Sequence, residues 1–395
     1  MKAVIFGPGR VGCGFAGQLL RGSGHEVVFV ARNQAMVNHF NRVGRYLVRL
    51  VGQGRTEEIM VEGIRAVWTG EPDKVAREIV DAGLVSTSVG FRNLAEISPL
   101  IALGLSRRAE PVNVISFENF GTAASYMRRR VKGCGPEGCN FSGHGFSPAL
   151  VSRVMSERLG DPAGNEPLVF VGDHPDEFVV YGKRLVRPIP EIKGMRVVDN
   201  YDAWFQKKLF MFSAGHATTA YLGYLKGYHY IHSAIRDPEI REAVLAAMRE
   251  GQQGLMAQYG GDLAGDEEHL LEIVARFENA ALNDSIDRVG RDPLRKLGKR
   301  DRLIGAARMA EKAGIEPEKL MLAVAAALYY CDQDDPSCTP IREELETIGP
   351  DKVLREVSGL NPGRRLSHGA RRIFAKLLEK GPRSPLLNLE KFFWA

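Results

Sequence analysis

The chain has 395 residues, a length that at roughly 150 residues per domain implies two or three domains. Hydrophobic residues make up 44% and charged residues 26%, which are values of globular proteins and exclude disordered and fibrous chains. The 53 Lys and Arg residues against 48 Asp and Glu residues leave a net charge of +5, too dispersed over this length to predict a nucleic-acid partner.

Three features predict a cytoplasmic protein without a membrane partner. The longest uninterrupted apolar run, Leu320 to Cys331, is shorter than the ~20 residues that a membrane-spanning helix requires, so we expect it to form a buried helix. The five cysteines are sparse and odd in number, which is not typical of a secreted disulfide framework. Met1 and Lys2 lead directly into an apolar stretch without the cleavage pattern of an export signal.

The first third of the chain alternates strand-like and helical patterns. Residues 1–6 are an apolar run that predicts a strand, and a glycine-rich turn and a helical pattern over Phe15–Leu20 follow it. The continuous apolar run Val27–Ala31 predicts a second strand that is buried on both faces. Further strands are expected at Tyr46–Val51, Ile59–Val61, Leu84–Ser86 and Val112–Ser116. This order predicts an α/β domain with a mostly parallel sheet.

The pattern changes after residue 128. Residues 128–200 are rich in Arg, then in Gly and Pro, and contain two strand-like runs, Leu168–Val171 and Glu177–Tyr181, that we interpret as an appended hairpin. From Asn200 onward the apolar residues repeat with helical period. We expect the basic stretch Arg364–Arg372 to be the solvated face of a late helix. The expected helices are Trp204–Phe212, Glu239–Gln258, Glu267–Phe277, Leu303–Lys312, Leu320–Tyr330 and Arg371–Glu379.

The motif Gly7-x-Gly9-x-x-Gly12 follows the first predicted strand and opens the first helix. In such a motif the first glycine permits a tight turn, the second lets the backbone approach a pyrophosphate, and the third lets the helix pack on the strand. The βαβ context distinguishes a dinucleotide-binding fingerprint from a glycine-rich turn that binds nothing. We therefore predict a Rossmann-type dinucleotide-binding domain at residues 1–199, including the hairpin, and a mostly α-helical substrate-binding domain at residues 200–395.

The residues after the second strand bear on the choice between NAD and NADP. NAD-specific sites place Asp or Glu there, where the carboxylate accepts a hydrogen bond from the ribose 2′-OH. This chain has Ala31, Arg32 and Asn33. Arg32 could bind a 2′-phosphate bidentately, which favours NADP, or it could be an ordinary surface arginine. The residues assigned to the cofactor are Gly7, Pro8, Gly9, Arg10, Val11, Gly12, Ala31, Arg32, Asn33, Ser88, Val89 and Glu118.

The segment from Lys208 to Gly223 places polar side chains within an apolar helical pattern. Ser213 and His216 are three residues apart and so share a helical face, while Lys208 lies two turns earlier with a stem long enough to reach the same cavity. Burial would lower the pKa of such a lysine toward neutrality and make it a usable general base. Taken alone, however, the pattern favours a snorkelling lysine and a hydrogen-bonded core histidine.

Five segments together resemble the mannitol-1-phosphate 5-dehydrogenases, within the metal-independent long-chain polyol dehydrogenases. The resemblance covers nearly the whole chain, and its last two segments are long and specific. The segments are the N-terminal glycine motif, Phe117–Asn119, Lys208–Gly223, Ala275–Asn279 and Asp287–Leu297.

The resemblance implies roles for individual residues. In this family the Lys of a Lys-x4-Asn-x2-His pattern is the general base and the His orients the substrate. That Asn, together with a second Asn from an upstream Glu/Asp-Asn pair, binds the alkoxide. Carried over to this sequence, Lys208 is the base, His216 is the orienting group and Asn119 is an oxyanion donor.

Three positions depart from the family pattern. Ser213 stands where Asn is expected, Ala31 where the cofactor-selecting acid is expected, and Ser152 where the family has the Asp of Val-Asp-Arg. Loss of an amide donor from an oxyanion hole costs about 10²–10³ in rate, although a serine hydroxyl can partly replace it, so we keep Ser213 among the catalytic residues. These changes bear on the substrate and leave the proposed base untouched.

The pattern Cys134-x4-Cys139-x4-His144 combines thiols with an imidazole, which are ligands that zinc prefers. The spacing fits no common structural zinc site, a fourth ligand is not evident, and the family that the chain resembles needs no metal. We therefore expect free thiols in a glycine-rich loop and no metal site.

A basic cluster in the helical domain is the candidate site for a substrate phosphate, because guanidinium groups match phosphate oxygens bidentately. The alternative for most of its members is a solvated face or ion pairs with neighbouring aspartates. Because residues 290–297 resemble the phosphate-using branch of the family, we single out Arg295 and Lys296. The cluster is Arg288, Arg291, Arg295, Lys296, Arg300 and Arg302.

We therefore expect an NAD(P)-dependent oxidoreductase that interconverts a polyol phosphate and a ketose phosphate. The resemblance implies D-mannitol 1-phosphate and D-fructose 6-phosphate. Two alternatives stay open: a sibling dehydrogenase that acts on another polyol or a sugar acid, and a dinucleotide-binding sensor that has lost turnover. The presence of both Lys208 and His216 argues against the sensor.

Overall fold

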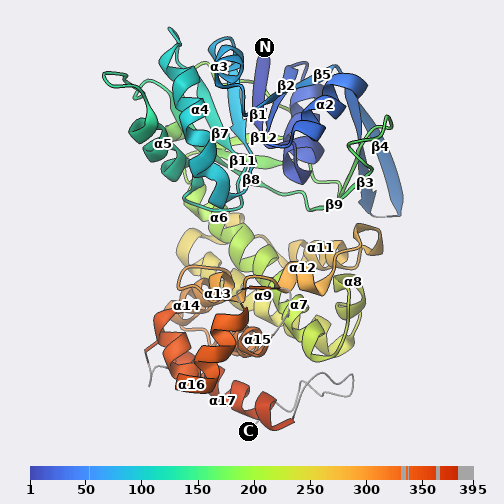
Figure 1. Cartoon of the computed structure of the whole chain (residues 1–395). Coiled ribbons are helices and arrows are strands. Elements are labelled where there is room, and N and C mark those ends of the chain that lie inside the picture. Colours follow the sequence, from blue (N-terminus) through green and yellow to red (C-terminus); the bar gives the residue numbers. More distant parts are fainter. Residues whose placement is uncertain (53, 331–334, 337, 362–364, 381–395) are drawn as a thin grey trace. The chain divides into compact units, whose positions relative to one another are not determined.

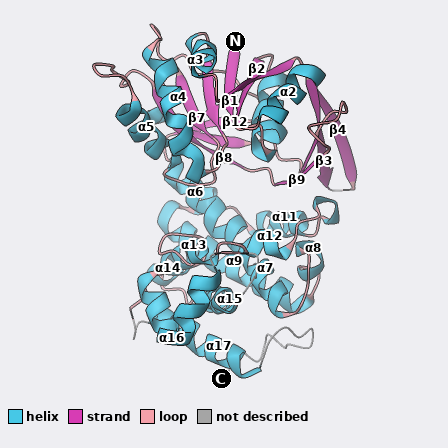
Figure 2. Ribbon diagram, viewed as in Figure 1, coloured by secondary structure: helices cyan, strands magenta, loops and turns pink. Residues whose placement is uncertain are grey.

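The computed structural model describes the chain except for residues 53, 331–334, 337, 362–364 and 381–395 (Figure 1). The chain divides into two compact units between Asp202 and Ala203. The N-terminal unit is built on β-sheets, whereas every element described after Asp202 is helical, apart from a single β-bridge between Tyr230 and Ser285 (Figure 2). The α/β fold expected for the first part and the helical fold expected for the second are both confirmed.

The main sheet of the N-terminal unit has eight strands in the order β12-β11-β8-β7-β6-β1-β2-β5. The six neighbouring strands β5, β2, β1, β6, β7 and β8 are parallel to one another, and β11 runs antiparallel to β8. The parallel strands therefore all end at the same edge of the sheet. The strands are β1 (Lys2–Phe6), β2 (Glu26–Ala31), β5 (Ile64–Trp68), β6 (Leu84–Thr87), β7 (Asn113–Ser116), β8 (Gly145–Val151), β11 (Phe178–Tyr181) and β12 (Met195–Val198).

Helices cover both faces of this sheet, as the side-chain alternation of β1 illustrates. Ala3 and Ile5 pack with the first helical segment and α2, whereas Val4 and Phe6 pack with α3, α4 and α5. All four side chains are fully buried, as expected for a parallel strand between two helical layers. The helices are η1 (Gly12–Gly17), α1 (Gln18–Gly22), α2 (Gln34–Val43), α3 (Pro72–Val80), η2 (Phe91–Asn93), α4 (Leu94–Ser106), α5 (Ala123–Cys134) and η3 (Gly182–Arg184).

A second, four-stranded sheet corrects two expectations. It has the order β4-β3-β10-β9, with β3 (Arg45–Gly52), β4 (Arg55–Glu62), β9 (Met155–Leu159) and β10 (Val169–Gly172). The strands expected at 46–51 and 59–61 thus form an antiparallel pair outside the parallel sheet; one face of β4 is exposed, which suits an antiparallel edge. The expected hairpin of 168–171 and 177–181 is wrong, because β10 pairs with β3 and β9 while β11 pairs with β8 and β12.

The C-terminal unit packs its helices around one hydrophobic core. The apolar run at 320–328 lies in α15 and is buried along its length, as expected. Arg365, Arg371 and Arg372 are exposed on α17, also as expected, whereas Arg364 and Cys331 lie outside the described residues. The helices are α6 (Tyr201–Lys208), η4 (Leu209–Ser213), α7 (Ala214–Leu225), α8 (Ile231–Ala234), α9 (Pro238–Tyr259), α10 (Gly261–Ala264), α11 (Glu267–Phe277), η5 (Ala280–Leu282), α12 (Ile286–Gly290), α13 (Pro293–Lys296), α14 (Ile304–Lys312), α15 (Glu318–Tyr329), α16 (Cys338–Glu356) and α17 (Arg365–Lys380).

None of the described helices is long and apolar enough to cross a membrane.

Candidate active site

The glycine-rich turn after β1 has the geometry that a dinucleotide site requires. Gly7 has a φ of +93°, a conformation that side chains disfavour. A Cβ on Gly12 would lie 1.9 Å from the Gly7 carbonyl oxygen, so the helix approaches the turn closely only because Gly12 has no side chain. Gly9 is exposed, and a Cβ there would meet nothing within 4 Å, which leaves open space at the start of the helix. The residues present therefore fit a bound pyrophosphate.

The helix that follows contains a π-turn, η1, and side chains from outside hold it. Tyr46 Oη donates to the Cys13 carbonyl at 2.9 Å, and Arg153 Nη1 donates to the Gly14 carbonyl at 2.8 Å. The Arg153 side chain is fully buried and also binds Gln18 Oε1 at 3.0 Å. The second sheet and the β8–β9 connection, which supply Tyr46 and Arg153, thus fix the start of the predicted cofactor helix.

The ends of β6 and β7 add the next predicted residues at the same edge. Ser88 Oγ donates to the Gly7 carbonyl at 2.8 Å, which ties the end of β6 to the glycine turn. Glu118 is buried and accepts hydrogen bonds from the backbone N–H groups of Val89 at 2.9 Å and Gly90 at 2.8 Å. Burial raises the pKa of Glu118 above its usual value in spite of these hydrogen bonds. Asn119, the next residue, is exposed.

The end of β2 places Ala31, Arg32 and Asn33 at this edge as well. Ala31 is buried at the end of the strand, and Asn33 is the N-cap of α2, accepting from the N–H groups of Ala35 and Met36. The Arg32 side chain is 76% exposed, and its Nη1 lies 3.1 Å from Glu96 Oε2. Asn33 is therefore accounted for by helix capping, while the Arg32 side chain has a solvent-exposed ion pair of the kind that contributes little to stability.

The remaining residues predicted for the turn have structural contacts. Pro8 is buried, Val11 packs against the core of the N-terminal unit, and Arg10 Nη1 donates to the Ser156 carbonyl at 2.7 Å. The twelve residues predicted for the cofactor thus come together at the carboxyl edge of β1, β2 and β6 and in the turn that follows β7, the edge at which open α/β sheets bind ligands.

In the C-terminal unit a π-turn aligns the three predicted catalytic residues. Lys208 ends α6, Ser213 ends η4 and His216 lies in the first turn of α7, so all three are on one continuous helical run. In an uninterrupted α-helix His216 would point about 80° away from Lys208. A π-turn takes up one additional residue, so Lys208 and His216 are about seven α-helical steps apart and Lys208 and Ser213 about four, both of which are same-face spacings.

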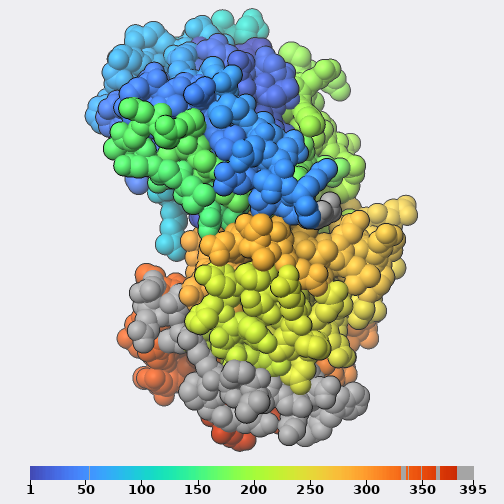
Figure 3. All heavy atoms as spheres, turned by 90° about the vertical axis from the view of Figure 1, so that its right-hand side faces the viewer, coloured from blue at the N-terminus to red at the C-terminus, as the bar shows by residue number. Residues whose placement is uncertain are grey.

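His216 is held by an acidic partner on another segment. Its Nε2 lies 3.1 Å from Asp284 Oδ2, and Asp284 Oδ1 accepts from Arg288 Nε at 2.6 Å. The imidazole stacks on Phe277, with ring centroids 4.9 Å apart. Burial lowers the pKa of His216, and the hydrogen bond to Asp284 offsets this only in part. Ser285, the residue after Asp284, forms a β-bridge with Tyr230. In Figure 3 the yellow-green and the orange parts of the C-terminal unit lie against one another.

The two residues predicted to bind phosphate differ in exposure. Lys296 is 3% exposed, and its Nζ donates to the Arg291 carbonyl oxygen. Burial lowers its pKa well below the usual value, and the charges of Arg302 and Arg295 add to this effect. The Arg295 side chain is 34% exposed, and its Nε lies 2.8 Å from Asp292 Oδ2. Of the pair, only Arg295 has a side chain that is partly exposed to solvent.

Cys134 ends α5, and the loop from there to His144 has structural contacts. Cys134 and Cys139 are free thiols, and His144 Nδ1 accepts from the Val112 backbone N–H at 3.2 Å. Across the described residues, no three or more His, Cys, Asp or Glu side chains are grouped so that they could hold a metal ion. Ser152 donates its backbone N–H to the Glu177 carbonyl at 3.2 Å.

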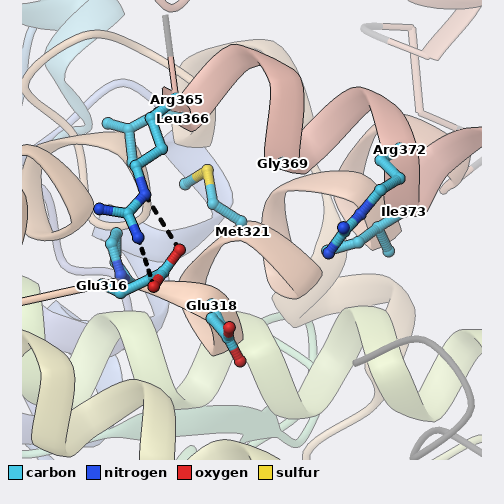
Figure 4. Close-up of a pocket in the computed structure, with 9 residues that line it drawn as sticks. Glu316, Glu318, Met321, Arg365, Leu366, Gly369, Arg372 and Ile373 are labelled. Atoms are coloured by element: carbon cyan, nitrogen blue, oxygen red, sulfur yellow. Dashed lines mark hydrogen bonds and ion pairs between the residues drawn. The ribbon is translucent and has the colours of Figure 1, made fainter. Parts of the chain in front are cut away.

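A separate cavity lies between the start of α15 and α17 in the C-terminal unit (Figure 4). Glu316 and Arg365 pair across one side of it, and Met321, Leu366 and Ile373 line it with apolar groups. None of the residues predicted for catalysis, cofactor or phosphate lines this cavity.

Sequence reasoning missed four features that build the site. Asp284 lies in no motif, and Arg153 belongs to the segment compared with Val-Asp-Arg, which gives it no role; each acts on a residue far from it in the sequence. The two π-turns, Gly12–Gly17 and Leu209–Ser213, leave no mark in the hydrophobic period. The buried polar residue His216 was the available signal, since a buried polar group needs a partner.

Both units match domain models of one family. Residues 1–192 match the mannitol dehydrogenase Rossmann domain, and residues 200–358 match the mannitol dehydrogenase C-terminal domain. These matches confirm the expected resemblance at the level of the polyol dehydrogenase family.

Solved structures share the fold at low sequence identity. The chain superimposes on a Pseudomonas fluorescens mannitol 2-dehydrogenase, in ternary complex with NAD and D-mannitol, with a TM-score of 0.77 at 14% identity, covering 96% of this chain and 92% of that one. A substrate-free D-sorbitol dehydrogenase gives a TM-score of 0.76 at 16% identity, covering 96% and 93%. A 2-dehydropantoate 2-reductase from Geobacter metallireducens gives 0.51 at 14% identity, covering 83% and 99%. With both domain models matched in order along the chain, the protein belongs to the mannitol dehydrogenase family and is an oxidoreductase with a dinucleotide-binding fold.

Proposed function

We propose that the protein oxidises a polyol phosphate to a ketose phosphate, and reduces it in the reverse direction, with NAD(P) as the hydride carrier. The observation that carries the proposal is the π-turn at Leu209–Ser213, which puts Lys208, Ser213 and His216 on one helical face. A base, a hydroxyl donor and an orienting imidazole on one face are the groups that alcohol oxidation requires. D-mannitol 1-phosphate and D-fructose 6-phosphate are the substrate pair we propose.

Lys208 is proposed as the general base. Its Nζ takes the proton of the substrate hydroxyl while the C–H bond on the same carbon breaks and its electron pair leaves as hydride. The nicotinamide, when bound, supplies the carbon that accepts this hydride. The products are the ketone, the reduced cofactor and a proton held on Lys208, so charge and atoms balance.

Asn119 and Ser213 are proposed to stabilise the oxygen. As the hydroxyl loses its proton, negative charge develops on this oxygen, and an amide N–H and a hydroxyl O–H are suitable donors to it. His216 orients the substrate by a hydrogen bond to a neighbouring hydroxyl. Ser213 is buried, which strengthens its interaction with a developing charge relative to water.

The cofactor is proposed to be NADP(H) at least as readily as NAD(H). With Ala31 at the end of β2 there is no carboxylate to repel a 2′-phosphate, and the largely exposed Arg32 can exchange its ion pair with Glu96 for a phosphate. The pyrophosphate would be held at the start of the helix by the backbone around Gly9 and Gly12.

Arg295 is proposed to bind the substrate phosphate, with Lys296 as its buried neighbour. The partly exposed guanidinium can turn from Asp292 to a phosphate. Lys296 donates to the Arg291 carbonyl and thereby holds the residues that precede α13, the helix that carries Arg295.

A direct assay tests the proposed function. Purified protein is mixed with fructose 6-phosphate or fructose and with NADPH or NADH, and nicotinamide absorbance is followed. We expect kcat/KM for fructose 6-phosphate to exceed that for fructose by orders of magnitude, and Arg295→Ala to reduce that ratio through the phosphorylated substrate. Arg355→Ala, at an exposed arginine of the same unit outside the basic cluster, is the matched control. Equal efficiency on the two ketoses would redirect the assignment to a non-phosphorylated polyol, and no turnover of either ketose would favour a dehydrogenase with another substrate or a sensor.

A further inference from the structure

Asp284 determines which nitrogen of His216 carries a proton. Its two carboxylate oxygens are divided between two partners: Oδ2 lies 3.1 Å from His216 Nε2 and Oδ1 accepts from Arg288 Nε at 2.6 Å. Burial raises the pKa of Asp284. The hydrogen bond from His216 and the charge of Arg288 lower it by more than burial raises it, so the pKa lies below its usual value. An ionised carboxylate can only accept hydrogen bonds, so Nε2 must be the donor.

The other nitrogen of the ring is left as an acceptor. The pKa of His216 is lowered by burial, with Asp284 opposing the shift and Arg288 and Arg302 adding to it, so the imidazole is neutral near pH 7. A neutral ring protonated at Nε2 carries its lone pair on Nδ1. Within the described part of the chain no protein group forms a hydrogen bond with Nδ1. Stacking on Phe277, with ring planes at 10°, fixes the orientation of the ring.

The backbone aims the Asp284 carboxylate. The preceding residue, Asn283, has a φ of +50°, and the Asp284 carbonyl accepts from the Ile231 N–H at 2.9 Å. The following residue, Ser285, caps α12 by accepting from the Arg288 N–H at 3.2 Å. Asp284 therefore sits between a left-handed residue and a helix cap, and Arg288 is held one turn away on the capped helix.

We propose that Asp284 is a positioning residue that holds His216 in the Nε2–H tautomer, so that His216 Nδ1 accepts a hydrogen bond from a substrate hydroxyl. Only the placement of the substrate at His216 rests on the proposed function, because the tautomer is a property of the protein without substrate. The arrangement selects for an alcohol group. A carboxylate at the same point would place an oxygen lone pair against the lone pair of Nδ1, so a sugar acid would be disfavoured.

Asp284→Asn tests the proposal because Arg288 determines how the new amide turns. Arg288 has only N–H donors, so the amide oxygen will face it and the amide N–H₂ will face His216 Nε2. The ring must then carry its proton on Nδ1, which converts the acceptor into a donor. Ring ¹⁵N NMR of histidine-labelled protein distinguishes the two tautomers, and loss of a signal in His216→Gln assigns the resonance.

We expect Nε2–H in the wild type, Nδ1–H in Asp284→Asn, and a KM for the polyol that rises about 10- to 100-fold in the variant with an unchanged Kd for the cofactor. Asp237→Asn is the matched control, since Asp237 is an aspartate of the same unit with a side chain only 10% exposed that pairs with Lys226 at 2.8 Å; it should leave the His216 tautomer unchanged.

An Nδ1–H or doubly protonated His216 in the wild type would overturn the proposal whatever the activity. A tautomer that switches in Asp284→Asn without a change in KM would overturn the positioning role. If the tautomers are as expected and no polyol is turned over, the tautomer assignment stands and the proposed function fails.

Discussion

Three lysines of the C-terminal unit, Lys208, Lys226 and Lys296, have different environments. Lys226 is 5% exposed and is neutralised by Asp237 and Glu239. Lys296 is also buried and bonds to a backbone carbonyl. Lys208 is half-buried and shares its helical face with Ser213 and His216. Because Lys208 shares a helical face with Ser213 and His216, the other two proposed catalytic residues of this unit, its removal tests the proposed chemistry.

Lys208→Ala should lower kcat by about 10²–10⁴, the contribution of a removed general base. The Kd for NADPH, measured by fluorescence, should change little, because the residues assigned to the cofactor lie on the N-terminal unit. Lys207→Ala, the adjacent lysine, is the control. Near-normal turnover of Lys208→Ala would show that another group is the base.

The choice of cofactor is a second property of single residues. Ala31→Asp should shift kcat/KM toward NADH by at least about tenfold, because a carboxylate at the end of β2 repels a 2′-phosphate and accepts from a 2′-hydroxyl. Arg32→Ala should lower kcat/KM for NADPH and leave kcat/KM for NADH unchanged. The comparison requires kcat/KM for both cofactors in each variant. A strong wild-type preference for NADH that Arg32→Ala leaves unchanged would contradict the prediction.

At the scale of elements, both functional segments contain a π-turn, and each serves alignment. The turn at Gly12–Gly17 lies at the start of the cofactor helix, and the turn at Leu209–Ser213 lies between the proposed base and His216. π-turns are uncommon and concentrate at functional sites. In the first of them, the partners of the helix carbonyls come from Tyr46 and Arg153, so the geometry of the helix depends on elements that are distant in sequence.

Arg153→Met should therefore destabilise the N-terminal unit by about 3 kcal/mol. The substitution removes the fully buried guanidinium that donates to the Gly14 carbonyl and pairs with Asp176. It should also weaken NADPH binding, since the start of the cofactor helix loses its anchor. Thermal unfolding and a fluorescence titration measure the two effects. Arg158→Met, in the neighbouring strand β9, is the control. A loss of stability with an unchanged Kd would limit Arg153 to a structural role.

At the scale of the whole molecule, local sequence patterns predicted the fold class, but they did not predict which segments distant in the sequence pair with one another. The helices at 239–258 and 267–277 were predicted nearly to the residue, because hydrophobic period and N-caps are local signals. The strands at 46–51 and 168–171 were recognised but assigned to the wrong partners, because strand pairing depends on contacts across the chain. For the same reason the fingerprint glycines could be predicted, while Asp284 could be found only after folding brought it to His216.

The stability of the molecule should also depend on pH through a partly buried carboxylate. Glu250, on α9, accepts hydrogen bonds from the Lys319 and Leu320 N–H groups at 2.8 and 2.9 Å and so caps α15. Burial raises its pKa to about 7, although these hydrogen bonds oppose the shift. The unfolded chain has a glutamate pKa of about 4.3, so between these values the folded protein holds a proton that the unfolded chain has released. The stabilisation is complete below the unfolded pKa and is lost as the pH rises through about 7.

Glu250→Gln removes this titration. Denaturant unfolding of the wild type, followed by circular dichroism at pH 5 and at pH 8, should give a free energy of unfolding that is lower at pH 8. In Glu250→Gln the difference between the two pH values should shift by about 2 kcal/mol in favour of pH 8, because the amide cannot ionise. Glu268→Gln, an exposed carboxylate on α11, should leave the wild-type difference in place. Glu250→Gln could instead keep the wild-type difference in unfolding free energy between pH 5 and pH 8. In that case Glu250 would be ionised in both the folded and the unfolded states over this pH range, and the pH dependence would come from other groups.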